Sequence, residues 1–259
     1  MTTVLITGST DGIGLRAAQT LRARGCDVIV HGRDPDRVAA ARDRVGAIAG
    51  LVYDLGDLHQ ATQLADAASD FSPDVLINNA GIYARERTLV ASGEATWVVN
   101  HLAASLLADA LIPGMAAGGR VIYVSSIAHG RASLDLDDPE FERRPYDHYA
   151  AYAQSKLANL LMAQETARRL GPGSLVAVNA LHPGVVGTKL LTEGFNIPGR
   201  DDLDAGSATS VHLALDADPR HTGGYWYRSK PAAPQGAGKD SQLAADLYDY
   251  TMQVIEERG

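Results

Sequence analysis

A glycine-rich turn near the start of the chain limits most strongly how the sequence can fold. Gly8, Gly12 and Gly14 lie close together in the stretch TGSTDGIG, and glycine is favoured where the backbone takes positive φ or a Cβ would collide with a neighbour. An apolar run, residues 4–6, precedes the turn, and apolar residues at helical spacing follow it. Such a strand-to-helix turn directs N–H groups and the positive end of a helix toward a phosphate. The alternative is a turn that only lets the helix pack closely on the strand.

Short apolar runs then alternate with helical stretches, which is the pattern of repeated βαβ units. The expected strands are residues 27–31, 49–55, 74–81, 120–126, 174–184 and 225–229, and the expected helices are residues 35–46, 57–71, 97–111 and 149–170. Right-handed crossovers predict an α/β fold with a Rossmann-type doubly wound parallel sheet and three α/β/α layers. We expect one domain over residues 1–259. Tyr225, Trp226 and Tyr227 are expected to pack as the last strand.

The charge balance and the cysteine count exclude several classes of protein. The chain has 31 acidic and 23 basic residues, a net charge of -8, and no basic stripe of the kind that binds nucleic acid. Cys26, the single cysteine, is expected to be a buried thiol in a reducing compartment. The eight histidines are scattered without paired spacing, so we expect no metal site.

The N-terminal segment and the apolar runs bear on localisation. The first expected strand begins within three residues of Met1, which leaves no room for a signal peptide. No apolar run reaches the roughly 18 residues of a membrane span. The sequence therefore predicts a cytoplasmic protein with no membrane anchor.

Two segments interrupt the alternation. Residues 128–148 are charged and contain two prolines, and residues 192–204 are rich in Gly, Pro and Asp. Both follow expected strands at the edge where ligands bind in such sheets. Because this composition buries little apolar surface, we expect both segments to be mobile without substrate and to order over it.

The stretch YAQSK places Tyr152 and Lys156 four residues apart, on one face of an expected helix. They could be an ordinary exposed tyrosine and lysine. A nearby ammonium, however, favours the phenolate and lowers the pKa of a tyrosine from about 10 toward working pH, which makes it a general acid or base. Ser126, at the end of an expected strand, could hydrogen-bond a substrate oxygen beside that tyrosine.

Taken in order, TGSTDGIG, NNAG, VVN, VSS, YAQSK and HPGVVGT resemble the short-chain dehydrogenase/reductase family over nearly the whole chain. SSIAHGR, SKLANLL and TGGYW further resemble its retinol-dehydrogenase-like branch. The resemblance implies a catalytic tetrad of Ser126, Tyr152, Lys156 and Asn100, with Asn100 fixing a water in a proton relay behind the lysine. The separation of Ser126 from Tyr152 is longer than usual in the family, so the serine assignment requires an insertion that loops out between them.

The resemblance also implies how a nicotinamide cofactor is bound. Asn78 would support the central sheet, and Lys156 would also bind ribose hydroxyls. Asp54 would accept a hydrogen bond from the adenine amino group, although it could instead be a helix N-cap. The expected cofactor-binding residues are Gly8, Thr10, Gly12, Ile13, Gly14, Arg33, Asp54, Leu55, Asn79, Ala80, Gly81, Tyr152, Lys156, Pro183, Gly184, Val185 and Thr188.

The family implies an oxidoreductase that moves a hydride between NADP(H) and a carbonyl or alcohol of a small, apolar substrate. One alternative is a regulator or scaffold that binds NADP without turnover. Another keeps the tetrad but uses it for isomerisation or dehydration. The family also implies a monomer or a homo-oligomer, either a dimer or a tetramer, and the sequence leaves the substrate itself open.

The end of the second expected strand bears on the choice of cofactor. NAD enzymes of this fold place an acid there for the ribose 2′-OH, and the corresponding residue here is Gly32. Arg33 follows it and can bind phosphate oxygens. Asp11 in the glycine turn and Asp34 argue against NADP(H), although Asp34 is explained as the N-cap of a helix with Pro35 at N1. We expect NADP(H), with NAD(H) as the alternative.

Overall fold

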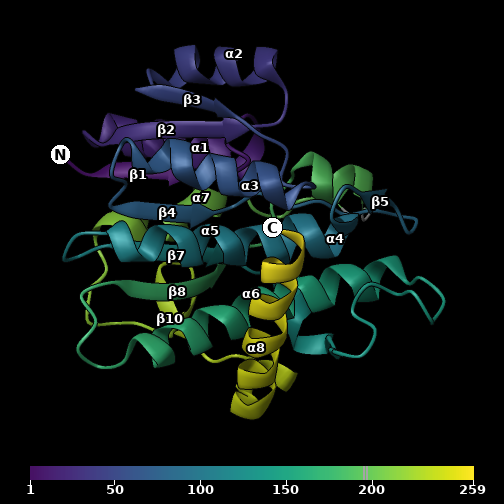
Figure 1. Ribbon diagram of the computed structural model, residues 1–259. Coiled ribbons are helices and arrows are strands. Elements are labelled where there is room, and N and C mark those ends of the chain that lie inside the picture. The colour runs from purple at the N-terminus through teal and green to yellow at the C-terminus, as the bar shows by residue number, and fades with distance from the viewer. Residues whose placement is uncertain (195, 197) are drawn as a thin grey trace.

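The computed structural model describes residues 1–194, 196 and 198–259 and contains an eight-stranded sheet (Figure 1). The strand order is β10-β9-β8-β7-β4-β1-β2-β3, and every pairing is parallel except that of β10 with β9. The strands are β1 (Thr3–Ile6), β2 (Asp27–Gly32), β3 (Ala49–Val52), β4 (Val75–Asn78), β7 (Arg120–Val124), β8 (Ala177–His182), β9 (Tyr225–Tyr227) and β10 (Lys230–Ala232). A separate two-stranded ribbon pairs β5 (Leu89–Val90) with β6 (Gly93–Glu94).

Helices cover both faces of the sheet. Apolar side chains of α1, α2 and α7 share one core cluster, and those of α3, α5 and α6 share the other, on which the C-terminal helix α8 packs (Figure 1). The helices are α1 (Gly12–Ala23), α2 (Pro35–Val45), α3 (Leu58–Ser69), α4 (Ala95–Trp97), α5 (Ala103–Leu111), α6 (His148–Leu170), α7 (Leu203–Leu215) and α8 (Ser241–Arg258). Short 3₁₀ or π segments are η1 (Val98–Leu102), η2 (Ile112–Gly114), η3 (Ile127–Arg131), η4 (Leu190–Gly194) and η5 (Gly236–Lys239). The predicted doubly wound fold is confirmed, and its inner strands are apolar because helices cover both of their faces.

Several details differ from the sequence predictions. The helix expected over residues 97–111 begins at Ala95 and contains the π-helical turn η1, a feature that recurs at functional sites. Strand β10 was not predicted, and it follows β9 through Arg228 and Ser229, which both have positive φ. Contrary to expectation, the segment Ala95–Gly114 is long enough, and by mean hydropathy apolar enough, to span a membrane. However, 78% of its 18-residue apolar window is buried inside the protein, as in the core helix of a globular domain.

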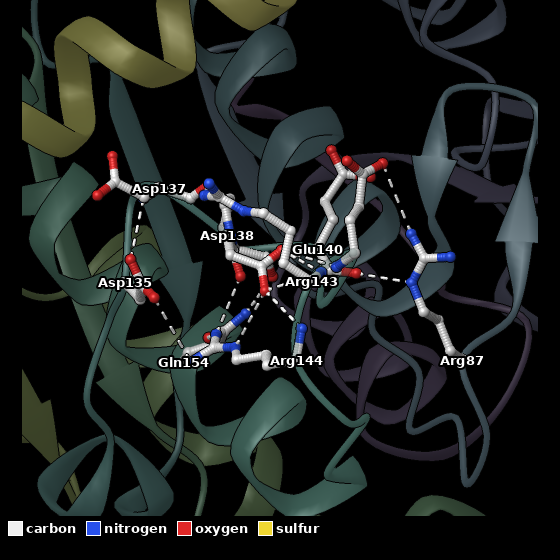
Figure 2. A network of polar contacts seen from close by, with 10 residues as sticks. Arg87, Asp135, Asp137, Asp138, Glu140, Arg143, Arg144 and Gln154 are labelled. Atoms are coloured by element: carbon white, nitrogen blue, oxygen red, sulfur yellow. Dashed lines mark hydrogen bonds and ion pairs between the residues drawn. The ribbon is translucent and has the colours of Figure 1, made fainter.

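Residues 128–148 do not form the loosely held lid predicted from their composition (Figure 2). Asp138 and Glu140 are only 6% and 5% exposed, and Phe141 is buried beneath the Arg144 guanidinium. The Asp138 carboxylate accepts hydrogen bonds from the N–H groups of residues 142–144. The prediction was wrong because protein groups rather than water satisfy these two carboxylates, and for Asp138 those groups lie inside the segment itself.

Glu140 ties this segment to the rest of the fold. Its carboxylate accepts hydrogen bonds from the Glu94 N–H at 2.7 Å and from Arg258 in α8 at 2.6 Å, and its carbonyl accepts one from Arg87 at 2.8 Å. On the other side Gln154 of α6 donates to the Pro139 carbonyl. The segment is therefore fastened both to the C-terminal helix and to the helix that carries Tyr152. Of the second predicted lid, 192–204, residues 195 and 197 lie outside the described residues.

We expect Glu140→Ala to lower the free energy of unfolding by about 2–4 kcal/mol, because it leaves the Glu94 N–H and the Arg258 guanidinium without their buried acceptor. Urea denaturation followed by circular dichroism measures the change. The matched control is Glu142→Ala, whose side chain is 70% exposed and pairs with Arg87 at 3.7 Å; its effect should stay below about 1 kcal/mol. Equal effects of the two substitutions would contradict the tethering role of Glu140.

Candidate active site

The glycine turn joins β1 to α1 and lies against the end of β4. Gly8 and Gly12 have φ values of +62° and +55°, which disfavour any residue with a side chain. A Cβ on Gly14 would lie 2.4 Å from Nδ2 of Asn79, which donates to the Thr7 carbonyl at 2.8 Å. The three glycines therefore serve both the conformation of the turn and its close approach to β4, and all three line a cavity.

Two cavities, of about 470 and 580 Å³, lie along the carboxyl edge of the sheet. Ile13, Asn79, Gly81, Thr188 and Leu190 line both of them, so the cavities are continuous. The smaller cavity, which we call the nucleotide cavity, also contains Gly8, Thr10, Gly12, Gly14, Arg33, Asp54, Leu55 and Ala80. The larger, which we call the substrate cavity, also contains Ser126, Tyr152, Lys156, Pro183, Gly184 and Val185. Every residue that was expected to bind the cofactor therefore lines at least one of the two cavities.

Tyr152, Ser126 and Lys156 meet in the substrate cavity. Ser126 and Tyr152 both line this cavity, and the Ser126 side chain is close enough to the Tyr152 hydroxyl to lower the pKa of that tyrosine. Lys156, on the same face of α6, has its ammonium nitrogen 5.8 Å from the Tyr152 ring centroid and donates to the Val124 carbonyl at 3.0 Å. The insertion between Ser126 and Tyr152 loops out as the assignment required, because the chain turns through η3 and returns to begin α6 at His148.

Burial controls the protonation of both titratable groups. It raises the pKa of Tyr152 to about 12, with the Ser126 hydrogen bond opposing the rise, and it lowers the pKa of Lys156 to about 8. The expectation that Lys156 lowers the tyrosine pKa toward working pH is therefore wrong for this structure. Desolvation of the phenolate outweighs the attraction of an ammonium that is itself hydrogen-bonded to a strand carbonyl.

Asn100 lies in the π turn and lines neither cavity, but it braces the wall behind the lysine. Its Oδ1 accepts from the Ile82 N–H at 2.7 Å, and its Nδ2 donates to the Ile82 carbonyl at 3.0 Å. Nδ2 also donates to Ser155 Oγ at 3.0 Å, and that hydroxyl donates to the Tyr152 carbonyl. Ser125, the residue before Ser126, donates its hydroxyl hydrogen to the Lys156 carbonyl at 2.6 Å. These side chains fix α6 against β4 and β7.

At one end of the nucleotide cavity lie the residues from which the choice of cofactor was predicted. A Cβ on Gly32 would lie 2.6 Å from Cγ2 of Thr10, so a longer side chain at this position meets Thr10. Arg33 is exposed, lines the cavity and has no ion pair with any described residue. Asp34 caps α2 by accepting from the Arg37 N–H, as predicted, with Pro35 at N1.

Asp11, which argued against a phosphate, is already engaged by the protein. It caps α1 through the Gly12 N–H at 2.8 Å, the main cause of its lowered pKa. It also forms ion pairs with Arg37 at 3.3 Å and with Lys189 at 3.2 Å. The glycine turn is thereby linked to α2 and to the segment after β8, and the carboxylate charge is balanced by two cations.

Asp54 and Asn78 are explained by local contacts. The Asp54 carboxylate accepts from the Gly56 N–H at 2.9 Å, and Asp57, not Asp54, caps α3. The N-cap interpretation of Asp54 was therefore wrong, because the helix begins three residues later. Asn78 donates to the Ala104 carbonyl at 2.8 Å and so joins β4 to α5.

The turn after β8 is held by Asp201. Gly184 has a φ of +101°, and a Cβ there would lie 2.6 Å from the Asp201 carboxylate, which accepts from the Val185 N–H at 2.8 Å. His182 stacks on Tyr227 of β9 with ring centroids 5.1 Å apart. The strand that carries Tyr227 thus also supports the rim of the substrate cavity.

Sequence reasoning missed several residues of the site. Arg37 lies in the first turn of α2, four residues after Arg33, and this spacing could have indicated that it lines the same cavity. His31 and Tyr53 line the nucleotide cavity, and Gln235 the substrate cavity, but no motif marks them. Among the residues that the structure describes, no group of three or more His, Cys, Asp or Glu side chains is placed to hold a metal ion.

Comparison with known proteins agrees with this geometry. The family model described as short chain dehydrogenase matches residues 2–196. DnrU of Streptomyces sp. (strain C5), named a putative daunorubicin C-13 ketoreductase, is 37% identical over an alignment of 269 positions that covers 98% of this chain and 92% of DnrU. Retinol dehydrogenase 12 of Homo sapiens is 35% identical over an alignment of 273 positions that covers 97% of this chain and 85% of the relative.

Solved structures give the same assignment. The crystal structure of an uncharacterized protein from Mycobacterium paratuberculosis has a TM-score of 0.86 and 33% identity and covers 99% of this chain and 94% of its own. A short chain dehydrogenase from Burkholderia cenocepacia in complex with NADP has a TM-score of 0.71 and 25% identity, over 87% of this chain and 95% of its own. The chain belongs to the short-chain dehydrogenase/reductase family of oxidoreductases, and its relatives include retinol dehydrogenases.

Proposed function

We propose that the protein is an NADP(H)-dependent oxidoreductase that interconverts a carbonyl and an alcohol on an apolar substrate. The observation that carries the proposal is the contact of Tyr152 with Ser126 beside Lys156, in a cavity continuous with the one that contains the glycine turn. When bound, the nicotinamide supplies the hydride transfer, and the chain supplies position and a proton.

Each residue of the tetrad has a role that follows from its surroundings. Tyr152 carries its proton at neutral pH, as a tyrosine ordinarily does, and burial raises its pKa further, so it can donate that proton to a carbonyl oxygen. Ser126 holds the hydroxyl of Tyr152 and can donate a hydrogen bond to the same oxygen. Lys156 stabilises the phenolate left after the transfer, and Asn100 fixes the wall behind the ammonium.

The preference for NADP(H) is supported by the end of β2 and by a relative. Thr10 crowds the position where an acid would meet a ribose hydroxyl, while Arg33 has no acidic partner among the described residues and Asp11 is neutralised by two cations. A bidentate guanidinium suits a phosphate. The solved Burkholderia cenocepacia enzyme holds NADP.

The walls of the substrate cavity support an apolar substrate. Apart from the tetrad, its lining is largely aliphatic, and the charged side chains Arg131 and Arg200 are exposed. A volume of about 580 Å³ accommodates a molecule of drug size. The name of the Streptomyces relative refers to a ketone substrate. A scaffold without turnover would bind NADPH but leave a panel of aromatic and aliphatic ketones unreduced.

Tyr152→Phe should lower kcat for ketone reduction by about 10²–10⁴-fold, because it removes only the proton donor. The dissociation constant for NADPH should stay close to that of the parent. The loss of NADPH absorbance with a panel of ketones measures kcat, and fluorescence titration measures the dissociation constant for NADPH. Tyr248→Phe, on α8, is the control for loss of a phenol elsewhere. Turnover by Tyr152→Phe at the parental rate would rule out the assigned proton transfer.

Arg33→Ala should weaken NADPH binding by about tenfold or more, because a charge-assisted contact to the 2′-phosphate is lost. NADH lacks that phosphate and should bind both proteins alike. Fluorescence titration of each cofactor into the parent, into Arg33→Ala and into the control Arg44→Ala, an exposed arginine at the far end of α2, gives the comparison. An NADPH affinity that survives the loss of Arg33 would overturn the assignment.

Lys156→Met should abolish turnover yet raise the stability of the protein at pH 7, since the folded state no longer buries an ammonium. The folded pKa is about 8, below the usual 10.5. Between these values the unfolded parent binds a proton that the folded parent has released, so parental stability rises with pH relative to the variant. The stability gap measured by urea denaturation should therefore shrink from pH 7 to pH 10. A gap that is constant with pH would contradict the assigned charge.

A further inference from the structure

The buried histidine at the end of β2 has no role in the chemistry described so far. His31 is 2% exposed and lies beneath the glycine turn. Its backbone N–H donates to Ser9 Oγ at 2.9 Å, and its carbonyl accepts from the Ser9 N–H at 3.0 Å. Its ring joins two parts of the nucleotide cavity, because Nδ1 lies 3.2 Å from the Gly8 nitrogen and Nε2 lies 3.1 Å from the Tyr53 carbonyl oxygen.

These contacts fix the tautomer of the ring. The Gly8 N–H can only donate, so Nδ1 must be the unprotonated acceptor. The Tyr53 carbonyl can only accept, so Nε2 must carry the hydrogen. Burial lowers the pKa of His31 to about 4, although the Asp54 carboxylate opposes the shift, and the ring is therefore neutral at working pH. A neutral Nε2–H tautomer satisfies both partners, whereas an imidazolium would place two donors against each other at Gly8.

We propose that His31 is a positioning residue for the cofactor: through Nδ1 it turns the Gly8 N–H inward and so sets the glycine turn, and through Nε2 it fixes Tyr53 at the adenosine end. The first half of this role follows from the conformation of Gly8. With φ at +62°, Gly8 directs its N–H at the imidazole. The next residues of the turn then lead directly into the N-terminus of α1, which faces the cavity.

The second half of the role concerns the opposite wall. The Tyr53 N–H donates to the Gly32 carbonyl at 3.1 Å, and its carbonyl is held by His31, so both backbone groups of Tyr53 are bound to the end of β2. Tyr53, Asp54 and Leu55 line the nucleotide cavity beside Arg33. The His31 imidazole therefore contacts both ends of the nucleotide cavity, the glycine turn at the phosphate end and Tyr53 at the adenosine end, and fixes the distance between them. This role rests on the proposed function, because it concerns the nucleotide that the cavity binds.

Two amide substitutions separate the two contacts. Asn places its carboxamide oxygen where Nδ1 lies and can accept from Gly8, whereas Gln reaches the Nε2 position and can donate to Tyr53. We expect His31→Asn to bind NADPH within about threefold of the parent. His31→Gln should bind roughly tenfold more weakly, because the Gly8 N–H has lost its acceptor. At saturating cofactor kcat should stay near the parental value in both, so the effect appears in the cofactor KM.

Amide exchange supplies a measurement that needs no cofactor. In hydrogen-exchange NMR of the full chain, the Gly8 amide should remain protected in the parent and in His31→Asn, and should exchange faster in His31→Gln. His59→Gln, a change at an exposed histidine on α3, is the control and should alter neither quantity. Equal NADPH affinities and equal Gly8 protection in the Asn and Gln variants would overturn the proposal. Failure of the parent to bind NADPH would instead contradict the proposed function, while the Gly8 exchange would still test the contact.

Discussion

The close approach between the β1–α1 turn and the end of β4 is the contact on which the remainder of the site depends. A Cβ on Gly8 would lie 2.8 Å from the Ala80 Cα, so the two backbones touch where a side chain would otherwise stand. Thr7 Oγ1 accepts from the N–H groups of Asn79 and Ala80, both at 3.0 Å. Beyond the ends of β1 and β4, these side-chain hydrogen bonds take the place of the backbone hydrogen bonds between the two strands. They satisfy backbone N–H groups that would otherwise be buried without partners. The two strand ends consequently form one rigid edge.

That edge determines where the ammonium group of Lys156 can lie. A Cβ on Gly81 would lie 3.1 Å from Lys156 Nζ and 3.5 Å from Asn100 Oδ1, so the absence of a side chain at this position lets both groups reach the wall. Ser125 holds the Lys156 backbone, and the Val124 carbonyl holds its ammonium. A buried charge is unfavourable unless it is hydrogen-bonded. The fold retains it because β4, β7 and α6 all contribute to its cage.

The sequence predicted the parts of this arrangement that depend on local pattern. Buried strands, helix caps such as Asp34, and glycines at a strand-to-helix turn each leave a signature within a few residues, and strand order brings the motif residues to one edge. Burial of polar groups leaves no such signature. From the sequence, Asp138 and Glu140 were interpreted as solvated charges. Only the structure shows that the Glu140 carboxylate accepts a hydrogen bond from Arg258, which is 118 residues away in the sequence. The raised pKa of Tyr152 was missed for the same reason. The four-residue spacing indicates that Lys156 is its neighbour on α6, but it does not indicate that the phenol is buried away from water.

The fastened insertion changes how access to the substrate cavity must be understood. Residues 138–141 are fixed to α6 through Gln154 and to α8 through Arg258, and none of the four lines the substrate cavity, so this part of the insertion is not a lid over it. The segment after β8 does line the substrate cavity, through residues 183–186, 188, 190 and 191 and through Arg200. There the Asp201 carboxylate accepts from the Val185 N–H and pairs with Arg228 at 3.6 Å. Lys189 of this segment reaches Asp11 of the glycine turn. This ion pair joins the glycine turn to the segment after β8, which borders both cavities, whereas the long insertion makes no such connection through residues 138–141.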